Sequence, residues 1–149
     1  MMELMELYRL AEQEDIPVDC FELRKRESLS LMDTDGSCYI AINPLFLDDS
    51  TDEKIKLAHE LGHCETGSFY NQYATQDIRR KHENRADKWA IMKLVPRDEL
   101  DAAVEAGYSD VWSLADYFGV SVEFMPKAIC LYMHGNLNVE QYFDDYSHS

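Results

Sequence analysis

Residues 59–63 read His59-Glu60-Leu61-Gly62-His63, and this short stretch decides how the whole chain is interpreted. Residues four apart lie on the same face of a helix, so His59 and His63 can both reach one metal ion. Glu60 projects beside them, where its carboxylate can take a proton from water. Two imidazole ligands and a carboxylate base at this spacing are typical of zinc hydrolases.

The preceding residues predict that this stretch lies on a buried helix. Ser50-Thr51-Asp52-Glu53 has the pattern of a capping box, with Ser50 as the N-cap and Glu53 at the third helical position. Apolar residues then recur around nearly the whole helix, at Ile55, Leu57, Ala58 and Leu61. Gly62 costs about 1 kcal/mol relative to alanine inside a helix, so we expect another element to pack closely there.

The residues before this helix predict a small sheet. A helix is expected over residues 2–15, followed by strand-like runs at residues 18–21, 29–32 and 38–42. Residues 33–37, Asp33-Thr34-Asp35-Gly36-Ser37, read as a hairpin turn between the last two runs. Because residues 38–42 directly precede the metal-binding helix, we expect them to form a sheet edge beside the metal, where a substrate backbone can pair.

The second half of the chain is predicted to be helical. Helices are expected over residues 77–94, 97–106, 110–118 and within 122–134, where Pro126 leaves the start uncertain. The sequence therefore predicts an α+β fold and a single domain. We divide it into a catalytic core (1–96), a helical subregion (97–135) and an acidic tail (136–149) with no assigned structure.

A catalytic zinc site needs a third protein ligand. The downstream candidates are Glu65, Asp77, His82, Glu83 and Asp87. Glu83 is favoured because Glu83 and Asp87 lie one turn apart on the second long helix, where Ala86 and Ala90 allow two helices to approach. Glu83 would bind the metal, and Asp87 would accept the free N–H of a ligand histidine. The alternative is an ordinary solvated acidic face.

These motifs together resemble the ImmA/IrrE family of metallo-endopeptidases, which are often encoded by phages or mobile elements. The similarity runs through Tyr39-Ile40-Ala41-Ile42-Asn43, the segment 57–63, Glu83-x-x-Ala86-Asp87 and Leu94-Val95-Pro96. The resemblance implies a compact zincin-like fold, one zinc ion per chain and, as substrate, a helix-turn-helix repressor. In this chain His59, His63 and Glu83 would hold the zinc, Glu60 would be the general base and Asp87 would support a ligand.

One catalytic role has no assigned residue. A donor is needed for the negative charge that develops on the substrate's carbonyl oxygen. Tyr70, Tyr73, His82 and His134 are all candidates, and the sequence does not choose among them.

Charge and composition weigh against other functions. Residues 114–128 have the spacing of a helix-turn-helix core, yet a net charge of −15 lacks the basic surface that DNA binding requires. No apolar run is long enough to span a membrane, and no signal peptide is recognisable, so a cytoplasmic protein is expected. The four scattered cysteines are then expected to be reduced thiols. A general cytoplasmic zinc peptidase and a zinc-stabilised interaction protein without activity remain as alternatives.

Overall fold

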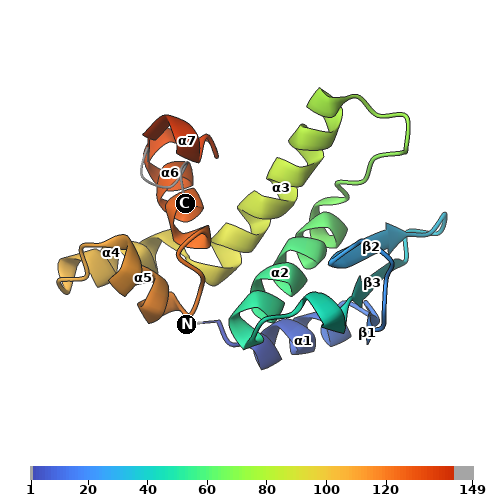
Figure 1. Ribbon diagram of the computed structural model, residues 1–149, viewed down its shortest axis with the longest axis horizontal. Coiled ribbons are helices and arrows are strands. Elements are labelled where there is room, and N and C mark those ends of the chain that lie inside the picture. Colours follow the sequence, from blue (N-terminus) through green and yellow to red (C-terminus); the bar gives the residue numbers. More distant parts are fainter. Residues whose placement is uncertain (1, 143–149) are drawn as a thin grey trace. The chain divides into compact units, whose positions relative to one another are not determined.

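The computed structural model describes residues 2–142 (Figure 1). Within this range the chain forms seven α-helices, a short 3-10 helix and a three-stranded sheet, which confirms the α+β class. The chain divides into two compact units, one of residues 2–90 and one that begins at residue 91.

The first unit contains the sheet and the motif helix. Helix α1 (Leu4–Gln13) is followed by strands β1 (Val18–Cys20), β2 (Ser28–Met32) and β3 (Cys38–Ile42). These match the expected helix and strands to within a few residues. Strands β2 and β3 are antiparallel and joined by the expected hairpin turn, where the Asp33 amide donates to the Ser37 carbonyl.

The expectation that residues 38–42 form a sheet edge is wrong. The strand order is β1-β3-β2, so β3 is the central strand. Strand β1 pairs with it in parallel, with Val18 opposite Ile40, and β2 pairs with its other side. Parallel pairing between segments some twenty residues apart leaves no local signature in the sequence. The edge strand that faces the motif helix is β2.

Helix α2 (Ser50–Thr66) carries the motif, but Asp49 rather than Ser50 is its N-cap. The Asp49 carboxylate accepts the Asp52 amide at 2.8 Å, and both residues are able to cap, so the pattern alone misplaces the start by one position. Glu53 therefore does not complete a capping box and instead accepts the Tyr8 hydroxyl of α1 at 2.6 Å. The helix ends at Gly67, whose φ of 64° is favourable for glycine.

Helix α3 (Gln76–Leu94) crosses α2 at Gly62, as the glycine's cost predicted. A Cβ atom added to Gly62 would lie 2.5 Å from the Ala86 carbonyl oxygen and 3.0 Å from the Ala86 Cα. The two backbones are thus as close as glycine allows. This contact brings the middle of α3 to the histidines of α2.

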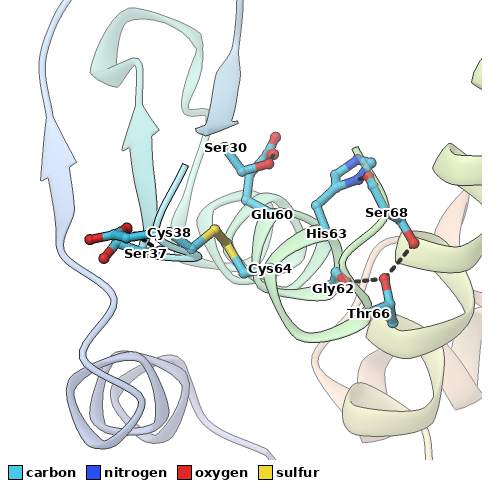
Figure 2. The surroundings of a disulfide bond; sticks show 10 residues. Ser30, Ser37, Cys38, Glu60, Gly62, His63, Cys64, Thr66 and Ser68 are labelled. Carbon is cyan, nitrogen blue, oxygen red and sulfur yellow. Dashed lines mark hydrogen bonds between the residues drawn. A yellow bond between two sulfur atoms is a disulfide. The ribbon is translucent and has the colours of Figure 1, made fainter. Parts of the chain in front are cut away.

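A disulfide joins Cys38 of β3 to Cys64 of α2, so the expectation of four reduced thiols is wrong (Figure 2). The two cysteines are 26 positions apart, and only the packing of β3 beside α2 brings their Cα atoms to 6.0 Å. Sequence spacing carries no sign of such a pair. Cys20 and Cys130 are free thiols.

The second unit holds the remaining helices, α4 (Arg97–Glu105), α5 (Val111–Phe118), α6 (Phe124–His134) and α7 (Val139–Tyr142). Pro126 lies in the first turn of α6, where a missing N–H costs nothing, and this removes the doubt about where the helix starts. The corner between α5 and α6 turns at Gly119, which has a φ of 65°. Its apolar side chains, which gave the helix-turn-helix spacing, form the core of this unit: Leu114, Ala115, Phe118, Met125 and Ala128.

The C-terminal segment of the chain is partly helical. Helix α7 lies in the segment 136–149 that had no assigned structure, and residues 143–149 of that tail lie outside the described residues. Among the residues described, no helix has the length and apolar character needed to cross a membrane.

Candidate metal centre

Three side chains from two helices converge on one point. His59 and His63 lie one turn apart on α2, and Glu83 comes from the facing turn of α3. The Glu83 Oε2 atom is 2.8 Å from His59 Nε2 and 3.2 Å from His63 Nε2. One ligand atom from each residue lies within 4.8 Å of the others. The structure thus brings together the three residues expected to hold a metal.

Each histidine is oriented by a contact at its other ring nitrogen. The Nδ1 of His59 is 2.7 Å from an oxygen of Asp87, the residue expected to support a ligand. The Nδ1 of His63 is 2.6 Å from the backbone carbonyl of Ser68. A carbonyl only accepts, so Nδ1 of His63 carries a proton, and Nε2, which faces Glu83, is the atom that would give up its proton to bind a metal. Ligand histidines in metal sites are typically held in this way.

Ser68 was not anticipated from the sequence. It is fully buried just after the end of α2, and its hydroxyl is 2.6 Å from that of Thr66, which in turn donates to the Gly62 carbonyl at 2.7 Å (Figure 2). These contacts fix the chain where it leaves the helix and aim the Ser68 carbonyl at His63. The C-terminal glycine of α2 was the available sign that a tight turn follows the second histidine.

Glu60 lies on the α2 face that points to the sheet and is only 6% exposed. Its two oxygens accept hydroxyl hydrogen bonds from strand β2: Ser28 donates to Oε2 at 2.6 Å and Ser30 to Oε1 at 2.7 Å. Sequence reasoning also missed these serines. Their alternation, Ser28-Leu29-Ser30, does place two hydroxyls on one face of a strand.

The structure places the other candidate residues in different environments. The Tyr70 hydroxyl donates to Glu83 Oε1 at 2.9 Å. Among the candidates for stabilising the negative charge on the substrate's oxygen, Tyr70 is therefore the one that contacts the three-residue group. Tyr73 is 84% exposed, and the His134 ring stacks on Tyr142 in the second unit. Among the residues that the structure describes, the buried Nδ1 atom of His82 has no hydrogen-bond partner. As for the other candidate ligands, Glu65 and Asp77 are exposed and do not belong to the three-residue group.

The charges of the centre are strongly coupled. Burial lowers the pKa of His59, but hydrogen bonds to Asp87 and Glu83 outweigh it and raise that pKa to about 10. Burial also lowers the pKa of His63, but its contacts with Glu83 and the Ser68 carbonyl outweigh this effect and raise that pKa. Hydrogen bonds from both histidines hold the pKa of Glu83 well below its ordinary value. Without a metal, protons on the imidazoles balance the carboxylates, and a cation is the natural replacement.

The donor set fits a zinc ion. Two imidazole nitrogens and one carboxylate oxygen form the three-ligand arrangement of catalytic zinc, which leaves a coordination position open. Ligand supports are present at both histidines. When bound, such an ion lowers the pKa of water and polarises a carbonyl group.

The fold and the centre together define a candidate metallopeptidase, in which a helical histidine pair meets a carboxylate from a second helix. The comparison with known families gives the more specific assignment. Residues 15–129 match the IrrE N-terminal-like domain of the Peptidase M78 family, and the chain belongs to this family. The membership supports a metallopeptidase type of function. The comparison with curated proteins finds no match.

Proposed function

We propose that this protein is a zinc-dependent endopeptidase that cleaves a specific protein substrate, a helix-turn-helix transcriptional repressor, and so relieves repression. The observation that carries the proposal is that Glu60 directly follows His59 on α2, and its charge contributes to raising the pKa of that imidazole, which belongs to the group formed by His59, His63 and Glu83. A site that only stabilises a fold has no use for a carboxylate base beside three ligands. The same set of residues supports zinc as the metal.

The role of Glu60 follows from its chemistry. Its carboxylate would accept a proton from the attacking water molecule at one of its oxygens and then give that proton to the amine that leaves. Its burial excludes bulk water, which strengthens such proton transfers. Asp87 and Ser68 would keep the two histidines in place, and Tyr70 would hold Glu83 through its second oxygen.

The substrate would bind as an extended strand along β2. Among the described residues no strand pairs with the outer side of β2, so its backbone groups on that side are available. Serines on the inner face of β2 touch Glu60, so a segment paired with the strand would pass beside the catalytic base. The proposed substrate-pairing strand is therefore β2 and not β3, the central strand, for which the sequence suggested this role.

The choice of a repressor rests on the family resemblance and on charge. Strand pairing reads little sequence, so specificity must come from other surfaces. A protein with a net charge of −15 attracts a basic partner, and the DNA-binding face of a repressor is basic.

The test is incubation of the zinc-loaded protein with the repressor encoded by the neighbouring gene, followed by intact-mass analysis at low and high salt. We expect one discrete cut that is weakened by salt and absent with Glu60→Gln. Cleavage of unrelated unfolded proteins while the repressor stays intact would instead identify a general peptidase. Zinc binding without any cleavage would identify a zinc-stabilised interaction protein.

A further inference from the structure

The contact between Glu60 and strand β2 is not explained by metal binding. Each oxygen of this buried carboxylate accepts a hydroxyl from a different serine, at 2.6 Å from Ser28 and 2.7 Å from Ser30. The two serines are two positions apart on one strand face, so both reach the same helical residue (Figure 2 shows Ser30 and Glu60). A carboxylate held at both oxygens keeps one plane and one rotamer.

Serine hydroxyls suit a residue that must take up and release a proton. A carboxylate offers about four lone-pair sites, so the two serines leave one site on each oxygen for water. A hydroxyl is both donor and acceptor: it donates to the ionised carboxylate and can turn to accept from the protonated one. An arginine in the same place would bind only the ionised form and would resist proton transfer.

A covalent link lies one helical turn further along the same face of α2. Cys64 is four positions after Glu60 and is bonded to Cys38, the residue that pairs with Met32 at the end of β2 (Figure 2). The hairpin is thus attached to α2 at two places, one covalent and one through Glu60. The serines therefore have a fixed distance to the carboxylate.

We propose that Ser28 and Ser30 are positioning residues that hold the Glu60 carboxylate in the orientation needed for general base catalysis. This inference rests on the proposed function.

The contact itself can be tested without any activity, on the metal-free protein. Thermal unfolding is measured for wild type, Ser28→Ala/Ser30→Ala, Glu60→Ala and the variant with all three changes. We expect the serine pair to lower Tm by several degrees when Glu60 is present and by much less when it is absent. If the serine changes lower Tm equally in the presence and absence of Glu60, the hydrogen bonds between them do not form, and the proposal is overturned.

The positioning role is tested by steady-state kinetics on zinc-loaded protein, with a quenched-fluorescence peptide that spans the cut found in the repressor. For Ser28→Ala/Ser30→Ala we expect kcat to fall about 10–100-fold, the effect of a slightly misplaced catalytic group, with KM within about threefold. Zinc content should equal that of wild type. The double threonine variant keeps both hydroxyls and should recover most of kcat.

Ser37→Ala is the matched control, because it removes a serine hydroxyl from the same hairpin. Ser37 lies in the turn, where its backbone amide donates to the Asp35 carboxylate. It should leave kcat unchanged. Coupling in the unfolding experiment with an unchanged kcat would make the serines merely structural and overturn the proposal. Lack of cleavage by wild type itself would refute the proposed function, and the positioning role would fall with it.

Discussion

A Cβ atom on Gly62 would lie 2.5 Å from the carbonyl oxygen of Ala86, so the motif helix and the helix that supplies Glu83 touch through their backbones. This contact sets the distance from the histidines to Glu83, the proposed third ligand. Two helices separated by an ordinary side chain would carry Glu83 away from both imidazoles.

Gly62→Ala tests the contact. Alanine should favour an isolated helix by about 1 kcal/mol, yet the forced separation should cost more, as overpacking does. We expect Tm to fall by roughly 5 °C or more and zinc affinity to weaken. Calorimetry and zinc titration measure both. A variant more stable than wild type would mean that the helices do not meet in this way.

Asp87→Asn tests the support of His59, whose Nδ1 lies 2.7 Å from the carboxylate. Loss of such a partner usually weakens metal affinity or activity by about 10–100-fold. Competition with a chromophoric chelator measures the affinity. Asp77→Asn is the control, since its side chain is 93% exposed on the same helix and should bind zinc as wild type does. If both variants bind equally, Asp87 is only part of a solvated face.

The disulfide predicts a measurable gain in stability. The bridge closes a loop between residues 26 apart, and the entropy that it removes from the unfolded chain corresponds to about 3.5 kcal/mol. We expect Cys38→Ser/Cys64→Ser to lower Tm by roughly 5–10 °C, while Cys20→Ser, which changes an exposed free thiol, has little effect. Alkylation of the denatured, unreduced protein should label only Cys20 and Cys130. Labelling of all four cysteines would contradict the bridge.

The raised pKa of His59 predicts how the metal-free protein responds to pH. Burial opposes its protonation, but Asp87 and Glu83 raise its pKa to about 10, against about 6.5 in the unfolded chain. Its contribution to stability is therefore complete below about pH 6.5 and is lost as the pH rises through 10. Between pH 7 and 10 we expect Tm to fall further in wild type than in His59→Gln, which cannot titrate. Parallel curves would show that His59 is not held in its charged form.

The sequence predicted most of the local structure because local structure depends on neighbouring residues. Helical and strand periodicity placed α1, α2 and the β2–β3 hairpin, and the cost of Gly62 pointed to a close contact. The N-cap was misplaced by one position because Asp49 and Ser50 are both competent caps.

Non-local pairing accounts for what the sequence did not predict. The parallel partner of β3 and the bond between Cys38 and Cys64 depend on segments that meet only in the folded chain. The hydrogen bonds from Ser28 and Ser30 to Glu60 span about thirty positions. The Ser68 carbonyl belongs to the backbone, which no side-chain motif reveals.

The central claim, that Glu60 acts as the base beside a zinc ion held by His59, His63 and Glu83, is tested most directly by comparing two variants. Zinc content and repressor cleavage are measured together on Glu60→Gln and Glu83→Ala. We predict that Glu60→Gln keeps about one zinc per chain and loses roughly 10²–10⁴ in rate, whereas Glu83→Ala loses most of the zinc. Unchanged zinc in Glu83→Ala, or cleavage by Glu60→Gln within a few-fold of wild type, would contradict the account.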